Sequence, residues 1–176
     1  MAALRSIAAP PDRTEIRPVR PSDSIEALTD LLHRAYADLG AMGLNYTAVD
    51  QSTSVTAERI ASGHCLVAVD ASALIGTIVV QRARADSSCE FFRKAGVAIA
   101  HQFAVAPEYQ KRGLGSRLLD CAEAWGRACE HREIAVDTAE PARHLISFYE
   151  RRGYRHVGYV QWEGKVYRSV VMSKNL

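Results

Sequence analysis

The chain has 176 residues, of which 48% are hydrophobic and 24% are charged, and its 22 basic and 20 acidic residues leave a net charge of +2. This length predicts one domain with a sizeable core, and the balanced charge argues against a nucleic-acid binder or a membrane-surface protein. No apolar run approaches the roughly 20 residues that a membrane-spanning helix needs. Pro10 and Pro11 interrupt an N-terminal stretch too short for a signal peptide. We therefore expect a flexible tail at 1–13 and a single domain at 14–176.

The four cysteines, Cys65, Cys89, Cys121 and Cys129, form no CxxC pair. Zinc sites in proteins are commonly built from such pairs, so no metal site is expected. Free thiols are typical of a reducing compartment. The cysteine pattern therefore predicts a cytoplasmic protein.

Apolar periodicity predicts the elements of the first half of the domain. Apolar residues recur at helical spacing after a possible cap at Ser24, and Gly40 ends the run. Runs rich in branched residues predict strands. In chain order the expected elements are a strand at 14–20, helices at 22–40 and 54–61, and strands at 64–70 and 73–81.

The second half of the domain begins with a nearly continuous apolar run at 97–107, which is typical of a strand buried on both faces. A helix follows from residue 114, on which Glu123 is expected to lie away from the apolar stripe and to pair with Arg127. The remaining elements are a strand at 133–138, a helix at 141–153 and a hairpin over 154–174. The resulting order, β-α-α-β-β-β-α-β-α-β-β, predicts an α/β (α+β) fold with a mixed sheet and helices on its faces.

The segment "QKRGLG" at 110–115 lies between the buried strand and the helix. Glycines permit positive φ and close approach of the backbone to a ligand, and the first amides of a helix attract anions. The chain lacks both the P-loop and the dinucleotide-binding fingerprint. On its own the segment is therefore either a phosphate site or a structural turn.

A longer stretch around this turn resembles the coenzyme A motif of the GNAT N-acetyltransferase superfamily. Gln110, Gly113 and Gly115 match the pattern Q/R-x-x-G-x-G/A after a strand that ends in an apolar-Val-x-Pro sequence. The later segment "FYERRGY" at 148–154 resembles the second signature of the family. The resemblance implies a mostly antiparallel sheet of about seven strands with helices on both faces. It implies an acyltransferase that moves an acetyl group from acetyl-CoA to a primary amine.

The resemblance also implies which residues hold acetyl-CoA. Backbone amides from Lys111 to Ser116 would bind its pyrophosphate, and the strand residues would run beside its pantetheine arm. Many members of the family have an asparagine where this chain has Ala142, so Ser147 or the backbone alone would replace that contact. The implied cofactor-binding residues are Phe103, Ala104, Val105, Gln110, Lys111, Arg112, Gly113, Leu114, Gly115 and Ser116.

By its match to the second signature, Tyr149 is the implied general acid that protonates the leaving thiolate. The alternative is a tyrosine of the core. For the general base we consider His101, which alternation along the strand would place on one face with Phe103 and Val105. A buried, hydrogen-bonded histidine is an equally good interpretation.

The acceptor site in such folds lies across the sheet from the cofactor, with Tyr36, Tyr46 and Glu90 as candidates here. The acceptor would be a small-molecule or peptide amine, and the protein a monomer or homodimer with no nucleic-acid or membrane partner. The second hypothesis is a catalytically silent CoA-binding sensor or partner subunit.

Overall fold

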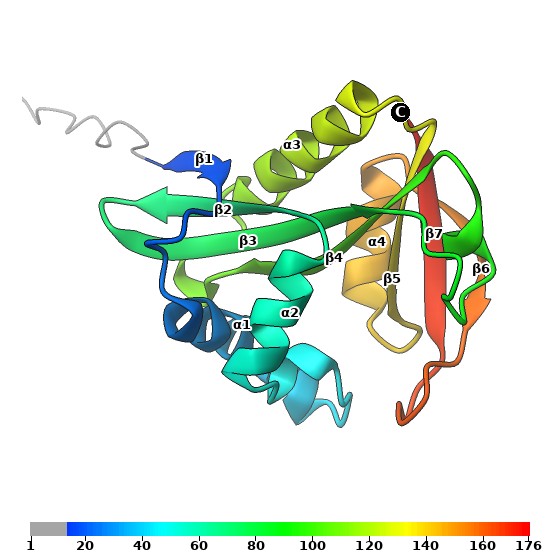
Figure 1. The fold of residues 1–176 in the computed structure, drawn as a ribbon. Helices are drawn as coiled ribbons and strands as arrows, with labels where there is room; N and C mark the ends of the chain where they lie inside the picture. Colours follow the sequence, from blue (N-terminus) through cyan, green and yellow to red (C-terminus); the bar gives the residue numbers. More distant parts are fainter. Residues whose placement is uncertain (1–13) are drawn as a thin grey trace, which may run out of the picture.

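The computed structural model describes residues 14–176, and the tail expected at 1–13 lies outside the described residues. Seven strands form one sheet in the order β1-β2-β3-β4-β5-β7-β6 (Figure 1). Every neighbouring pair is antiparallel except β4 and β5. The predicted element order is confirmed. The elements are β1 Glu15–Pro18, α1 Ile25–Ala41, η1 Thr47–Val49, α2 Thr53–Ala61, β2 His64–Asp70, β3 Ala73–Arg82, η2 Phe91–Arg93, β4 Val97–Val105, η3 Pro107–Tyr109, α3 Leu114–Ala128, β5 Glu133–Ala139, α4 Arg143–Arg151, β6 Arg155–Val160 and β7 Ser169–Asn175.

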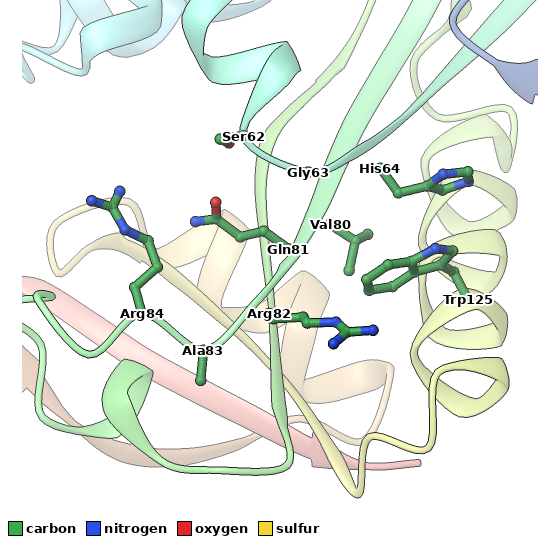
Figure 2. Close-up of a pocket in the computed structure, with 9 residues that line it drawn as sticks. All are labelled: Ser62, Gly63, His64, Val80, Gln81, Arg82, Ala83, Arg84 and Trp125. Carbon is green, nitrogen blue, oxygen red and sulfur yellow. The ribbon is translucent and has the colours of Figure 1, made fainter.

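Helices cover both faces of the sheet, with α1 and α2 on one face and α3 on the other (Figure 1). Successive residues of a strand point to opposite faces, and the end of β3 shows this directly. Arg82 extends toward Trp125 of α3, whereas Gln81 extends toward Ser62 at the end of α2 (Figure 2). Each strand of this part of the sheet therefore presents one set of side chains to α1 and α2 and another to α3.

Local sequence signals explain where the first helices begin. The hydroxyl of Ser24 accepts a hydrogen bond from the Ala27 amide at 3.1 Å, and the hydroxyl of Ser52 caps α2 through Val55 at 3.3 Å. Such caps satisfy amides that have no partner within the helix. The leucines of α1 are fully buried against the sheet, as the apolar spacing predicts. All four cysteines are free. No helix within residues 14–176 is long and apolar enough to cross a membrane.

Glu123 of α3 contradicts the sequence analysis, which placed it on the solvated side of the helix. Its side chain is buried, and its carboxylate accepts hydrogen bonds from Lys174 Nζ at 2.7 Å and from the Tyr154 hydroxyl at 3.2 Å. Arg152 lies 3.8 Å away. The prediction is wrong because α3 packs against the C-terminal elements as well as the sheet. Glu123 thus joins α3 to β7 instead of pairing with Arg127.

Candidate active site

The central feature of the site is an opening in the sheet between β4 and β5. These parallel strands pair only where Val97–Ile99 faces Glu133–Ala135. Beyond this short seam β4 continues to Val105 and β5 to Ala139, and the two strands run apart (Figure 1). The last part of β4 therefore has a backbone edge that β5 does not cover.

Hydrogen bonds around this edge show which backbone groups face the opening. The Ala106 amide donates to Ile75 on the β3 side at 2.9 Å, so the alternation of backbone groups turns those of Val105 toward the opening. The Val105 carbonyl accepts from Gln110 Nε2 at 3.0 Å, and the Phe103 carbonyl accepts from the Tyr36 hydroxyl at 3.1 Å. The Val105 N–H consequently points into the opening.

The predicted face of His101 is wrong because β4 contains a bulge. His101 lies opposite Val79, whereas Ala104 lies opposite Thr77, so β4 has one more residue than β3 over this stretch. Gln102 has a φ of 50° at this point. An extra residue reverses the alternation of side chains beyond it. His101 therefore shares a face with Ala104 and not with Phe103 and Val105.

The bulge is held by a short chain of buried polar groups. Gln102 Nε2 donates to Gln51 Oε1 at 3.1 Å, and Gln51 Nε2 donates to Thr56 Oγ1 of α2 at 2.7 Å. A hydroxyl of α1 completes the chain, since Thr29 Oγ1 donates to Thr56 at 2.8 Å. A backbone in the left-handed region costs energy for a non-glycine residue, and this chain stabilises that geometry by fixing β4 to both helices.

The glycine turn ends directly at α3. Gly113 has a φ of 84° and occupies the position before the first helical residue, where it has no side chain to cap the amides that follow. Gln110 anchors the start of the turn on β4 through its bond to Val105. Uncapped amides at a helix N-terminus form a site for an anion. A Cβ on Gly115 would lie 3.5 Å from Phe103, so the turn also lies against the end of β4.

A cavity of about 670 Å³ lies at the opening. Among residues 14–176 no group of three or more histidine, cysteine or acidic side chains is placed to hold a metal ion. The cavity combines aromatic and charged side chains from α1, α2, β4, β5, α4 and the connection between β6 and β7. Its lining includes Tyr36, Tyr46, Arg59, His101, Phe103, Asp137, Tyr149, Trp162, Lys165 and Tyr167.

Tyr149 of α4 is 7% exposed and reaches this cavity from the wall that follows β5. Burial raises the pKa of its phenol well above the ordinary value, and the nearby Tyr36 and Asp137 raise the pKa further. Its ring packs against Phe148 and Tyr154, with centroids 5.3 and 5.5 Å away. At neutral pH the phenol is therefore protonated, and its ring is fixed in position.

A comparison with known protein families identifies the family of the chain. The model of the Acetyltransferase (GNAT) family matches residues 25–154, which is most of the chain. The chain belongs to the GNAT acetyltransferase family. The matched region contains the opening, the glycine turn and Tyr149. The resemblance found in the sequence is therefore confirmed.

Relatives of this GNAT protein support the same assignment. The S-(2-succino)cysteine N-acetyltransferase of Bacillus subtilis strain 168 is 28% identical over 157 residues, which cover 86% of this chain and 90% of the relative. PH1933 of Pyrococcus horikoshii OT3 has a similar fold, with a TM-score of 0.72 at 19% identity over 93% of this chain and 98% of that structure. A GNAT acetyltransferase of Elizabethkingia anophelis with acetyl-CoA bound has a TM-score of 0.66 at 17% identity, over 94% and 99% of the two chains. The predicted fold is thus confirmed.

The structure brings several of the predicted site residues together. Tyr36, Tyr46, His101 and Tyr149 all line the cavity. Glu90 does not line it, because this exposed residue lies before the short helix η2. The residues expected to hold the cofactor form the end of β4, the turn and the start of α3, with Lys111 at a φ of 60°. Phe103 connects the cofactor-binding residues with the cavity, because it lines the cavity and lies against Gly115 of the turn.

Among the charged residues that line the cavity, Arg59 of α2 and Asp137 of β5 were not candidates from the sequence. Arg59 carried no signal, since a cation in a short amphipathic helix is usually solvated. Asp137 did carry one, because it is the only charged residue inside the apolar strand segment at 134–139, and charges are rarely buried without a partner.

Ala142, which replaces the usual asparagine of the family, is fully buried just before α4. Its amide donates to the Ala139 carbonyl at 2.9 Å, and this hydrogen bond closes the turn between β5 and α4. Ser147 is half-buried on α4. A pantetheine contact by Ser147 or by backbone groups therefore stays a prediction.

Burial, together with the charges of Arg59 and Arg84, lowers the pKa of His101 to about 3. Its Nε2 lies 3.3 Å from the Ser62 hydroxyl, while Nδ1 is buried without a partner among the described residues. The imidazole is therefore neutral down to low pH and is a weak base. These observations favour the interpretation of His101 as a buried, hydrogen-bonded histidine.

We expect His101 to reduce the stability of the protein in mild acid. Below pH 6.5 the histidine of the unfolded chain takes up a proton, whereas the folded state takes it up only near pH 3, so stability falls as the pH falls through this window. The loss is at most about 1.4 kcal/mol per pH unit. Urea unfolding at pH 7 and pH 5 should show a smaller loss for His101→Gln than for the wild type. Equal losses, or an acidic limb of the pH–rate profile that disappears in the variant, would contradict this view of His101.

A substitution in the glycine turn should weaken coenzyme A binding. A valine at position 113 would face the φ of 84° that Gly113 adopts, which costs about 1–2 kcal/mol for a residue with a Cβ. The loop would shift to relieve this strain and displace the amides before α3. We expect Gly113→Val to raise the Kd for CoA about 5–30-fold and Lys111→Ala less than about fivefold. Calorimetry on both variants measures this, and the reverse order would show that side-chain charge dominates binding.

Proposed function

We propose that this protein transfers the acetyl group of acetyl-CoA to the primary amine of a small, carboxylate-bearing acceptor. One observation carries the proposal: the uncovered edge of β4 and the buried phenol of Tyr149 lie at one cavity, and Phe103 of that edge also lies against the uncapped N-terminus of α3. The amides at 111–116 would bind the pyrophosphate. The backbone of Phe103–Val105 would hold the pantetheine arm as an additional strand.

The reaction needs a neutral amine, whose lone pair attacks the thioester carbonyl carbon. The Val105 N–H, which faces the opening, would stabilise the negative charge that develops on the carbonyl oxygen. As the C–S bond breaks, the Tyr149 hydroxyl gives its proton to the sulfur. The amine nitrogen loses one proton as the amide forms, and that proton restores the tyrosine through the groups of the cavity. The net change is one proton moved from nitrogen to sulfur.

The class of acceptor follows from the relative in Bacillus subtilis, which is named for S-(2-succino)cysteine. That compound has a primary amine and several carboxylates. The cavity contains cations that could receive such groups, Arg59 and Lys165. We therefore take a small S-substituted cysteine as the proposed acceptor. The four free cysteines support a reducing, cytoplasmic setting.

A CoA-thiol release assay tests the proposal. The purified protein would receive acetyl-CoA with S-(2-succino)cysteine, S-carboxymethylcysteine, spermidine or a peptide with a free N-terminus. Thiol release with the cysteine derivatives supports the proposal. Thiol release with only the peptide or only spermidine would show that the acceptor belongs to that class instead. Tight CoA binding with no release for any amine would favour the second hypothesis, a silent CoA-binding sensor or partner subunit.

A further inference from the structure

Arg59 is unusual among the arginines of the described region. It lies on α2 at the wall of the cavity, and its Nε is buried without a hydrogen-bond partner. No acidic side chain within residues 14–176 lies within ion-pair distance of its guanidinium, whereas Arg84 on the same cavity wall is bound to Asp86 at 2.8 Å. A desolvated cation without a partner is costly. Arg59 therefore has hydrogen-bonding capacity at the cavity wall that no residue of 14–176 uses.

A second cation, Lys165, lines the same cavity. Burial, and then the charge of Arg59, lowers the pKa of Lys165, which donates to the Asn45 carbonyl at 2.6 Å. It also contributes to the low pKa of His101. Glu58 and Glu163 lie on the exposed rim and form no ion pair with Arg59 in the described part of the chain. An anion between Arg59 and Lys165 would relieve the repulsion between them.

Asp137 places a carboxyl group in the same cavity, and burial raises the pKa of this group above its ordinary value. It lies on β5, and its Oδ2 accepts a hydrogen bond from Trp162 Nε1 at 2.8 Å. Its charge is felt by Tyr149, Tyr36 and Tyr46, so it lies near the proposed acid. It interacts with Arg59 only through the longer-range electrostatic field and not as an ion pair. The two charges are therefore separated within one cavity.

We infer that Arg59 and Asp137 are the two recognition groups of the acceptor site, with Arg59 binding a carboxylate and Asp137 binding the amino group of a free amino acid derivative. This assignment rests on the proposed function and adds to it the residues that determine specificity. A planar guanidinium can bind a carboxylate through two parallel hydrogen bonds. The amino group held at Asp137 would lie beside Tyr149, where the thioester sulfur is expected.

Binding measurements test the assignment independently of turnover. In the presence of CoA, the Kd of S-carboxymethylcysteine would be compared by calorimetry with that of its diamide, which keeps the amine and lacks both carboxylates. We expect the wild type to bind the diamide about 10–100-fold more weakly, as for the loss of a charged hydrogen bond. Arg59→Gln should remove this preference, and Arg59→Lys should restore part of it. Arg151→Gln, an equal change of charge on the exposed side of α4, should preserve it.

A second pair of ligands tests the role assigned to Asp137. The deamino analogue of S-carboxymethylcysteine should bind the wild type at least about tenfold more weakly than the amino acid, and Asp137→Asn should abolish that difference. Equal affinity of the wild type for all three compounds, or no binding of any, would overturn the assignment without a variant. If the amino acid binds as expected but no thiol is released, the proposed function fails while the assignment of Arg59 and Asp137 holds.

Discussion

Replacing Tyr149 by phenylalanine should lower kcat about 10²–10⁴-fold, the range typical for loss of a general acid. The Kd for CoA should change less than about twofold, because the proposed contacts of the cofactor come from β4 and the glycine turn. The substitution removes one hydroxyl and keeps the ring that packs against Phe148 and Tyr154. Steady-state kinetics and calorimetry on the same preparation measure the two effects.

Tyr159→Phe is the matched control, because Tyr159 is 49% exposed and lies on β6, away from the cavity. It should leave kcat unchanged. The raised pKa of Tyr149 gives a further expectation: the acid stays protonated, so its titration should produce no basic limb in the wild-type rate profile below pH 10. Wild-type turnover of Tyr149→Phe would show that the phenol is a core group only.

The largest expected effect on stability belongs to Glu123→Ala. The carboxylate is buried and bound to Lys174 and Tyr154, so its removal leaves a partly buried ammonium, a phenol and part of the Arg152 guanidinium without their acceptor. Breaking a buried pair from one side costs about 3–5 kcal/mol. Urea unfolding at pH 7 should show this loss as a lower midpoint with an unchanged slope.

Asp38→Ala provides the comparison for Glu123, since Asp38 is an exposed acid in the last turn of α1 with no side-chain partner among the described residues. Its replacement should change the free energy of unfolding by less than about 0.5 kcal/mol. The double variant Glu123→Leu with Lys174→Met should recover most of the stability that Glu123→Ala loses. A loss below about 1 kcal/mol in Glu123→Ala would show that the carboxylate is solvated.

The sequence was sufficient to predict the element order and the position of the glycine turn, because both depend on local signals. Apolar periodicity located α1 and β4, and the cap at Ser24 located the start of α1. Gly113 was identified as a turn residue because glycine readily adopts the positive φ that it has in the structure. These features need no knowledge of which strands become neighbours.

Apart from Asp137, the missed features depend on contacts between elements distant in the sequence. The bulge at Gln102 is stabilised by Gln51 and Thr56, which lie on another part of the chain, so alternation alone misplaced His101. Arg59 became a candidate only when the structure placed it in one cavity with Asp137. The sequence gives the charge of a side chain and its place in the apolar periodicity, whereas its role in a site depends on which residues surround it.

The short seam between β4 and β5 also has a consequence for how the protein folds. The strands β1 to β4 form one run of antiparallel pairs, and β5, β7 and β6 form another. Within each run the strands pair along most of their lengths, whereas the seam joins the runs through only three residue pairs. Two cooperative folding units of this kind would open separately in hydrogen exchange, each protecting its own amides. The site lies where the two units meet, so it is complete only when both have folded.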